Sequence, residues 1–463
     1  MSLCLRGEKV ISPARQTAFD ILLRVETQQA YASELLHSDR TAALSAADCG
    51  LCMELVMGVL RWRSRLDSQI AQFSFTPLRK LDLEVLTALR IGVYQLEFLH
   101  RVPARAAINE SVDLVKLSRK TSAAPLTNAV LRKIPKTSNE VREQRRQGNL
   151  MPPSVNAAPI TGESLASGFA HPLWLVERWI QNYGAGKAEA ICRHNQCLPT
   201  AALRLRDAAA EEELRKIGIE LAPGALLRGA RRVLSGDPSH TFACHEGRIA
   251  IQDEASQLVA ALVGTGARIL DCCAAPGGKT FAIADRNPQS EIIAVELHEH
   301  RAELMRRLVS VAHVRIVVAD ARALPVNGGF DRILVDVPCS GTGTLARNPE
   351  IKWRLKPEDL SGLQESQAAI LSAALHHLLP GGRLIYSSCS LEPEENEAVI
   401  ERVLTQANGA VRLLDCRDEL ERLQRESELA WPEVESLLSG RFLRTVPGAH
   451  PCDGFFAAVL EKA

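Results

Sequence analysis

The spacing of apolar residues changes near residue 137 and divides the chain into two regions of different type. Between Ala14 and Leu36 apolar residues recur every three or four positions, which predicts an amphipathic helix. The same spacing returns in further stretches, at about 46–74, 82–99, 105–118 and 124–134. Few stretches alternate as strands do, so the first region is predicted to be an all-helical bundle.

The second region alternates short apolar runs with longer helical patterns. Residues 137–168 are rich in Pro, Asn, Ser and Gly, have no period and are expected to form a linker. Residues 169–250 are mixed, and apolar runs follow from residue 268: ARILDCC, EIIAVEL, VRIVVAD, FDRILVDV and GRLIYSSC. Such alternation predicts a parallel, doubly wound sheet with helices on both faces. The expected fold class is multidomain: an all-α bundle, a small mixed α/β domain and a C-terminal α/β Rossmann-like domain.

Length and composition agree with several soluble domains. The 463 residues exceed one ordinary hydrophobic core, and the apolar (46%) and charged (24%) shares are those of globular proteins. No apolar run approaches the roughly 18 residues of a membrane helix, and the N-terminal residues lack a signal-peptide pattern. The 12 scattered cysteines indicate reduced thiols. A cytoplasmic protein without membrane contact is therefore expected.

Charge is unevenly distributed although the formal net charge is zero. Residues 1–150 carry 22 Lys and Arg against 15 Asp and Glu, and the remainder carries 33 against 40. The excess is steepest between Lys116 and Arg146. Its basic residues are Lys116, Arg119, Lys120, Arg132, Lys133, Lys136, Arg142, Arg145 and Arg146. This run indicates either a solvated face or a binding surface for a polyanion.

The first predicted strand of the sheet ends in DCCAAPGGKT, residues 271–280. A P-loop requires glycine where Cys273 stands, and no G-x-G-x-x-G opens the following helix. What remains is a glycine-rich turn where backbone can approach a ligand closely. The candidate ligand-binding residues in it are Cys273, Ala274, Ala275, Pro276, Gly277, Gly278 and Lys279.

Two acidic residues extend this candidate site. Glu296 closes the second strand, where a carboxylate can accept hydrogen bonds from ribose hydroxyls. Asp320 follows the third strand and could meet an adenine amino group. Together with the glycine turn they describe an adenosine site without phosphates, which suits S-adenosyl-L-methionine.

Two cysteines occupy similar places, each shortly after an apolar run. Cys339 lies in ILVDVPCSGTG and Cys389 in IYSSCSLEPEEN. Neighbouring strands lie about 4.8 Å apart, so both thiols could face one substrate if these strands pair. Lys279 is a candidate to favour a thiolate, and Asp336 at the fourth strand's end is expected to contact a base, the cofactor, or both. Buried structural thiols or a disulfide are the alternatives.

The motifs DCCAAPGGKT, DVPCSGTGT and YSSCS, in this order, resemble the RNA 5-methylcytosine methyltransferases of the RsmB, Fmu or Sun type, in the Nop2/Sun superfamily. The resemblance includes GRIAIQDEASQL, NPEIKWR and DGFFAAVL, and the N-terminal ARQTAFDILLRVE and PLTNAVLRKI are similar to NusB-like RNA-binding domains. The chain departs from the family at Asp207, where an Asn is usual.

The resemblance implies domains at 1–136 (NusB-like, RNA-binding), 169–250 (small mixed α/β, RNA-binding) and 251–463 (methyltransferase), with a linker at 137–168. It implies S-adenosyl-L-methionine as cofactor, RNA as partner, with 16S ribosomal RNA favoured, and a monomer. Cys389 is then the nucleophile that adds to carbon 6 of cytosine, and Cys339 assists release. Transfer RNA, another ribosomal site, or an RNA-binding scaffold without catalysis are the alternatives.

Other motifs are not assigned to chemistry. The pairs Cys49 with Cys52 and Cys192 with Cys197 lack a second half-site, and core packing is favoured for both. His298 and His300 lack the spacing of a metalloprotease helix. No metal is expected.

Overall fold

The computed structural model describes residues 11–135, 160–309 and 311–463. The chain folds into two compact units. Unit 1 holds residues 1–198 together with a ten-residue return at Leu345–Arg354, and unit 2 holds Pro199–Thr344 and Leu355–Ala463. The finer domain boundaries expected from the sequence stay a prediction.

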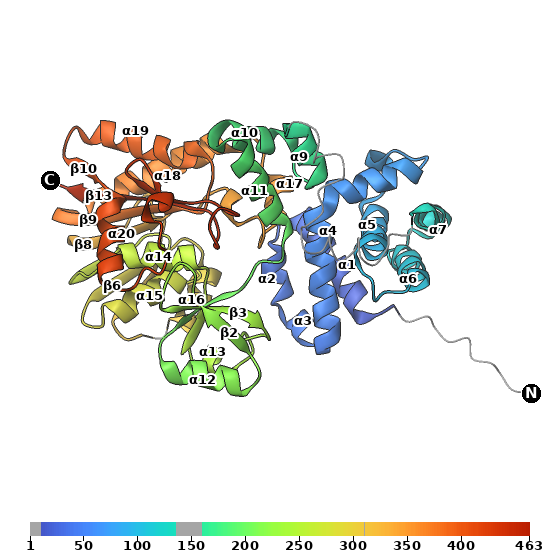
Figure 1. The fold of residues 1–463 in the computed structure, drawn as a ribbon, viewed down its shortest axis with the longest axis horizontal. Coiled ribbons are helices and arrows are strands. Elements are labelled where there is room, and N and C mark those ends of the chain that lie inside the picture. Colours follow the sequence, from blue (N-terminus) through green and yellow to red (C-terminus); the bar gives the residue numbers. More distant parts are fainter. Residues whose placement is uncertain (1–10, 136–159, 310) are drawn as a thin grey trace, which may run out of the picture. The chain divides into compact units, whose positions relative to one another are not determined.

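Unit 1 is built from helices in its described residues, as the apolar spacing predicts (Figure 1). The helices before residue 135 are α1 (Pro13–Gln28), α2 (Ala32–Leu36), α3 (Asp39–Ala42), α4 (Ala46–Phe73), α5 (Leu83–Phe98), α6 (Ala104–Leu117) and α7 (Ala124–Lys133), with 3₁₀ turns at Leu78–Lys80 and Thr121–Ala123. Ser45 caps α4, its side chain accepting from Asp48 N, and Pro at the first turn starts α1.

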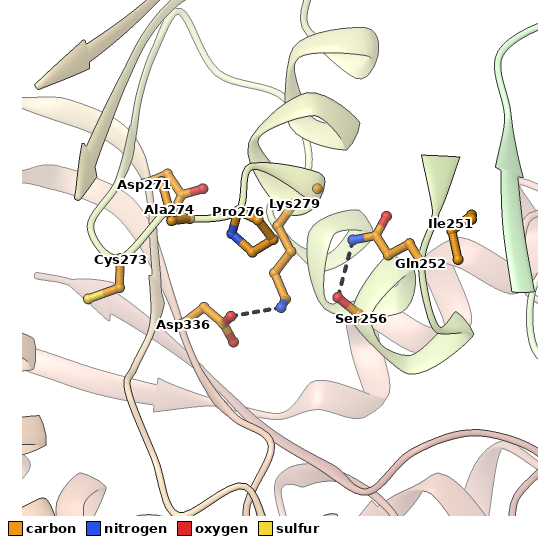
Figure 2. Close-up of a pocket in the computed structure, with 11 residues that line it drawn as sticks. Ile251, Gln252, Ser256, Asp271, Cys273, Ala274, Pro276, Lys279 and Asp336 are labelled. Carbon is orange, nitrogen blue, oxygen red and sulfur yellow. Dashed lines mark hydrogen bonds and ion pairs between the residues drawn. The ribbon is translucent and has the colours of Figure 1, made fainter. Parts of the chain in front are cut away.

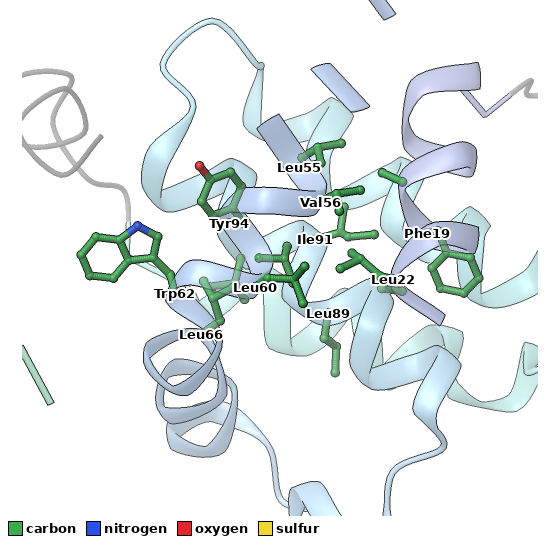
Figure 3. Packing of buried hydrophobic residues seen from close by; sticks show 14 of the residues in the cluster. Phe19, Leu22, Leu55, Val56, Leu60, Trp62, Leu66, Leu89, Ile91 and Tyr94 are labelled. Atoms are coloured by element: carbon green, nitrogen blue, oxygen red, sulfur yellow. The ribbon is translucent and has the colours of Figure 1, made fainter. Parts of the chain in front are cut away.

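One apolar core joins these helices (Figure 3). Figure 3 shows side chains from α1, α4 and α5 packed together, including Leu22, Leu60 and Ile91. Trp62 and Phe98 contact each other with ring centroids 5.1 Å apart. The apolar stripe that begins at Ala14 is buried along one side of α1, which is the face that the sequence pattern assigns to the core.

Residues 160–198 add three helices to unit 1: α9 (Gly162–Gly168), α10 (Leu173–Tyr183) and α11 (Ala185–Gln196). Trp179 of α10 is fully buried, and the Gln196 side chain donates to the carbonyls of Arg61 and Phe169. Most of the expected linker, 137–168, lies outside the described residues, and α9 occupies its end.

The return at Leu345–Arg354 is held by polar contacts within unit 1. It contains helix α17 (Ile351–Arg354). Lys352 is 1% exposed and its Nζ donates to Arg61 O over 2.8 Å, while Trp353 Nε1 donates to Leu60 O over 2.6 Å. The carboxylate of Glu350 accepts from Ala32 N over 2.9 Å. These bonds satisfy buried polar groups that would otherwise be costly.

Unit 2 begins with a small antiparallel sheet of strand order β2-β3-β1-β4. Its elements are β1 (Ala202–Leu205), α12 (Ala208–Lys216), β2 (Glu220–Pro223), β3 (Ala230–Ser235), α13 (Phe242–His245) and β4 (Ile249–Ile251). Asp207, the departure from the family pattern, caps α12, because its carboxylate accepts from Ala210 N over 2.6 Å. Its role here is the start of a helix.

The larger sheet of unit 2 has the strand order β11-β12-β13-β9-β8-β5-β6-β7, with β10 paired to β13. The predicted runs form its parallel part. These strands are β5 (Arg268–Asp271), β6 (Glu291–Glu296), β7 (Val314–Val318), β8 (Phe330–Asp336) and β9 (Leu378–Ser388). Antiparallel strands follow at β10 (Val411–Leu414), β11 (Leu438–Ser439), β12 (Phe442–Thr445) and β13 (Phe455–Lys462).

Helices cover both faces of this sheet through two separate apolar cores. On one face lie α14 (Glu254–Leu262), α15 (Gly278–Arg286) and α20 (Cys416–Arg425), and α16 (Glu299–Leu308) contacts β6 and β7. The other face is covered by α18 (Asp359–His376) and α19 (Glu397–Ala407). The expected doubly wound sheet is thus confirmed.

The basic run of the N-terminal region is only partly described. Lys116 pairs with Asp113 and Lys120 with Asp82, whereas Arg119, Arg132 and Lys133 are exposed at the ends of α6 and α7. The remaining predicted members, Lys136, Arg142, Arg145 and Arg146, lie outside the described residues.

Two glycines of α4 give a matched test of the helical core. A Cβ at Gly58 would lie 2.0 Å from Cζ of Tyr94, whereas a Cβ at Gly50 would meet nothing within 4 Å. Gly58→Ala should destabilise the protein by about 1–3 kcal/mol, because the buried tyrosine must move. Gly50→Ala should instead stabilise it by about 0.5–1 kcal/mol through helix propensity. Thermal unfolding of both variants checks the prediction, and equal shifts of the unfolding temperature in both would contradict it.

Candidate active site

The carboxyl ends of β5, β8 and β9 carry the loops that the sequence singles out. The chain runs from β5 outward to β6 and β7, and then returns to the other side of β5 to form β8 and β9. Strand order therefore reverses between β5 and β8, and the loops after these strands diverge there. Ligands of such sheets bind at this reversal. The glycine turn after β5 and the Cys339 loop after β8 flank it.

A pocket of about 130 Å³ opens at this position (Figure 2). Of the residues predicted from sequence, it is lined by Cys273, Ala274, Ala275, Pro276, Gly278, Lys279 and Asp336. Its other lining residues are Ile251, Gln252, Ser256 and Asp271. Ile251 ends β4 and Gln252 follows it, so the edge of the small antiparallel sheet contributes one wall.

Lys279 and Asp336 form the central ion pair of the pocket. Lys279 Nζ and Asp336 Oδ2 are 2.7 Å apart, and Ser387 Oγ donates to Asp336 Oδ1 over 2.6 Å. Figure 2 shows the lysine reaching from the start of α15 toward Asp336. Burial opposes the charge of Lys279, but the attraction of Asp336, with a further contribution from Cys389, raises its pKa above the ordinary value. The lysine is therefore a fixed cation.

Asp271 is a buried carboxyl at the end of β5. It is 1% exposed, and Thr280 Oγ1 donates to its Oδ2 over 2.7 Å. Its Oδ1 lacks a hydrogen-bond partner among the described residues, and Asp271 is one of the residues that line the pocket. Burial raises its pKa to about 7, with Asp336 adding to the rise and Thr280 and Lys279 opposing it. An orphaned buried acceptor of this kind fits a ligand that brings a donor.

The two thiols lie together in the part of the sheet next to the pocket. Cys339 Sγ and Cys389 Sγ are 3.1 Å apart, and both cysteines are free and partly exposed. The hydrogen bond to Cys389, followed by burial, raises the pKa of Cys339 well above its ordinary value. Either sulfur can be the donor of this contact. The expected pairing of neighbouring strands β8 and β9 is confirmed.

Glu296, Asp320 and Gly277 were also predicted for the site but do not line the pocket. Glu296 is buried, and its Oε1 accepts from His298 N over 2.9 Å. Asp320 is bound by Arg322, which lowers the pKa of the carboxyl. Gly277 shapes the turn: its φ is +105°, and a Cβ there would lie 2.7 Å from Val309 Cγ2.

Four pocket residues were missed as site residues by the sequence analysis. Asp271 is the first residue of the DCCAAPGGKT motif, and Ile251, Gln252 and Ser256 lie in GRIAIQDEASQL, which carries the family resemblance. Gln252 Nε2 donates to Ser256 Oγ over 3.1 Å, and Gln252 Oε1 is buried without a partner among the described residues. The strand-end position of Asp271 was an available signal, whereas the inward orientation of Gln252 was not.

The side chains set aside in the sequence have ordinary surroundings. Cys52 and Cys192 are buried in unit 1, where burial raises the pKa of each to about 12. Within the described ranges, no group of three or more His, Cys, Asp or Glu residues is placed to hold a metal. No helix in that part of the chain combines the length and apolarity needed to cross a membrane.

The sheet order, the reversal point and the pocket are those of the Rossmann-like methyltransferase fold. Residues 262–461 match the family described as 16S rRNA methyltransferase RsmB/F, and residues 12–136 match the NusB family. The chain belongs to the RsmB/F family of methyltransferases and carries a NusB-family domain, which confirms the resemblance and the fold class.

Relatives and a solved structure resemble the chain over most of its length. It is 34% identical over 463 residues to the Bacillus subtilis (strain 168) protein named "Probable ribosomal RNA small subunit methyltransferase B", covering 97% of this chain and 98% of that one. It is 34% identical to "Ribosomal RNA small subunit methyltransferase B" of Pseudomonas syringae pv. tomato, covering 90% and 89%. The crystal structure of PH0851 shares the fold, with a TM-score of 0.74 at 21% identity over 98% and 100% of the two chains.

The raised pKa of Asp271 predicts a specific pH dependence of stability. Between the unfolded value of 3.8 and the folded value of about 7, the folded state binds more protons than the unfolded state. Stability from this group is therefore lost as pH rises through about 7, at about 1.4 kcal/mol per unit of pKa difference. Asp271→Asn cannot ionise, so its stability should not fall with pH for this reason. The unfolding temperature of the variant, relative to that of the wild type, should therefore rise from pH 5 to pH 8. A difference in unfolding temperature that does not change with pH would contradict the assignment.

Proposed function

We propose that this protein transfers a methyl group from S-adenosyl-L-methionine to carbon 5 of a cytidine in 16S ribosomal RNA, through a covalent bond between Cys389 and carbon 6. The observation that carries the proposal is the 3.1 Å separation of the Cys339 and Cys389 sulfurs beside the pocket. The names of the bacterial relatives, which specify ribosomal RNA of the small subunit, support the substrate.

The chemistry explains why two thiols are needed. Carbon 5 of cytosine is a weak nucleophile and does not attack a methyl sulfonium directly. A Cys389 thiolate that adds to carbon 6 would turn the ring into an enamine, and carbon 5 could then take the methyl group as the sulfonium–methyl bond breaks and a neutral thioether leaves. The proton on carbon 5 must afterwards leave, and the carbon–sulfur bond must break to restore the ring. A second group beside the first serves this release, and Cys339 is in reach.

The charges around the thiols support this assignment of roles. The hydrogen bond to Cys389, followed by burial, raises the pKa of Cys339, which suits it to the second role, release, better than to the first. The Lys279 cation interacts electrostatically with Cys389, so it is proposed to assist this nucleophile. Asp336 fixes this cation from the other side through the 2.7 Å ion pair. Lys279 and Asp336 therefore set the electrostatics of the nucleophile, and either can also contact the edge of the base.

The residues around the pocket fit S-adenosyl-L-methionine, which supplies the methyl group when bound. The orphaned Oδ1 of Asp271 suits a cationic donor such as the ammonium of the methionine part. The backbone of the turn Cys273–Gly278 lies along the pocket, and the glycine at position 277 keeps that turn tight against α16. Glu296 and Asp320 stay proposed as contacts to ribose and adenine, Glu296 from the end of β6 and Asp320 from the segment after β7.

The helical domain is proposed to bind the RNA. Arg119, Arg132 and Lys133 are exposed, and Lys133 Nζ lies 5.0 Å from the ring centroid of Phe75, which is 93% exposed. Exposed cations bind phosphates, and an exposed aromatic ring next to them can stack on an unpaired base. This combination suits a structured RNA with single-stranded positions.

The two cysteines can be separated by covalent trapping. Cys389→Ala removes the nucleophile and should neither methylate RNA nor bind it covalently. Cys339→Ala leaves addition possible but impairs release, so it should accumulate a protein–RNA adduct on a denaturing gel with cognate 16S RNA. Methylation should fall at least a hundredfold in both variants, because each removes one required step. An adduct in Cys389→Ala but none in Cys339→Ala would reverse the two roles.

The RNA surface is tested by the salt dependence of binding. Arg132→Gln with Lys133→Gln should lower the slope of log affinity against log salt by about 0.7–0.9 for each phosphate contact that is lost. The control is Arg402→Gln with Arg425→Gln, which removes the same charge from exposed positions of α19 and α20. Equal slopes for both double variants, measured by fluorescence anisotropy with 16S RNA fragments, would assign the contacts to another surface.

A further inference from the structure

A buried carboxylate connects the loops that carry the two thiols. Glu395 ends the short 3₁₀ helix η4 (Pro393–Glu395) behind β9, and it is fully buried. Its Oε1 accepts from Ser340 N over 2.8 Å and from Gln367 Nε2 over 2.9 Å. Its Oε2 accepts from the hydroxyls of both Ser340 and Ser390, which are 3.0 Å from each other. Ser340 follows Cys339, and Ser390 follows Cys389.

Residues that contact or adjoin Glu395 also bind the chain on both sides of each cysteine. Gln367 Nε2, which donates to Glu395, also donates to Pro338 O over 3.0 Å. Cys339 therefore lies between Pro338, bound by Gln367, and Ser340, bound by Glu395. Asn396 contacts the residues on both sides of Cys389: its Oδ1 accepts from Ser388 Oγ over 2.5 Å, and its Nδ2 donates to Ser390 O over 2.9 Å. The serines are buried while the cysteines are partly exposed. The polar network thus fixes the backbone and leaves the sulfurs accessible.

The number of donors fits an ionised carboxylate. A carboxylate only accepts hydrogen bonds and has about four lone-pair sites, and the described contacts of Glu395 supply four donors. Burying such a charge is tolerated only when it is hydrogen-bonded in this way. A single group that accepts from both loops couples their positions, because moving either loop breaks bonds to the same carboxylate.

We propose that Glu395 is a positioning residue that holds the Cys339 and Cys389 loops at the spacing required for addition to the base and release from it. The spacing itself is a property of the fold, whereas its catalytic consequence rests on the proposed function. Replacing Glu395 with aspartate shortens the side chain by one methylene, so the carboxylate cannot accept from both loops. The two sulfurs then lose their fixed separation.

The spacing can be measured without catalysis. Dibromobimane bridges two nearby thiols when each displaces one bromide, and mass spectrometry of the peptides identifies the bridge between Cys339 and Cys389 among the remaining cysteines. Glu395→Asp should form this bridge at least tenfold more slowly than the wild type. Ser340→Ala with Ser390→Ala keeps the carboxylate, removes both hydroxyls and should slow bridging several-fold. Glu401→Gln, which removes an exposed carboxylate from α19, should bridge as the wild type does.

Activity then separates positioning from folding. In Glu395→Asp, methylation under saturating RNA should fall at least tenfold, with RNA affinity and the unfolding temperature close to those of the wild type. Unchanged bridging in Glu395→Asp and in the serine double variant would overturn the proposal. It would also be overturned if bridging fell only in proportion to the unfolded fraction of each variant. If Glu395 controls bridging but the wild type does not methylate RNA, the proposed function fails and the positioning role stands.

Discussion

The parallel pairing of β8 with β9 is the constraint on which the candidate active site depends. Their register places Asp336 opposite Ser387, and Val337 N donates to Ser387 O over 2.9 Å. Both strands therefore end at the same level, and the thiols two or three residues further along arrive within 3.1 Å of each other. A one-residue slip would turn every side chain of one strand to the opposite face. The buried apolar cores on both faces exclude that slip, so packing far from the sulfurs brings the two loops side by side.

Three carboxyl groups near the strand ends of unit 2 differ in how far other groups of the protein compensate them. Asp336 has a cation and a hydroxyl donor, and Glu395 has four donors, so each is compensated within the protein. Asp271 accepts from the Thr280 hydroxyl, and burial is the main cause of its raised pKa. Asp271 and Gln252 both line the pocket, and each has a buried oxygen without a hydrogen-bond partner among the described residues. Unsatisfied buried acceptors along a pocket are expected where a ligand brings the donors.

Much of the fold could be predicted from the sequence, because the spacing of apolar residues shows which face of each helix or strand is buried. The helical stretches from residue 46 onward and the five parallel strands coincide with the apolar runs, whereas the stretch 14–36 divides at Gln29 into α1 and α2. The pairing of the thiols followed from the fact that adjacent strands are about 4.8 Å apart. The site was less predictable. Gln252 reaches the pocket from another sheet, and no local pattern reports which distant segment covers a strand end. In the sequence, Glu395 is one of three acids in the polar segment EPEEN, which is typical of an exposed loop. It is buried because serines of two separate loops donate hydrogen bonds to its carboxylate, and the sequence does not show that contact.

The two cysteine loops are followed by different parts of the chain. The Cys389 loop begins and ends in unit 2, where Asn396 and Glu395 hold it. After the Cys339 loop, the chain belongs to unit 1 from Leu345, and there the carbonyl of Ala346 accepts from Arg61 and buried Lys352 donates to the carbonyl of Arg61. Lys352 Nζ also lies 5.0 Å from the ring centroid of Trp353, so the buried amino group contacts both a carbonyl and an aromatic ring. Each cysteine loop is therefore continued by a segment whose buried polar groups find their partners within one unit: Glu395 and Asn396 in unit 2, and Arg61 and Lys352 in unit 1.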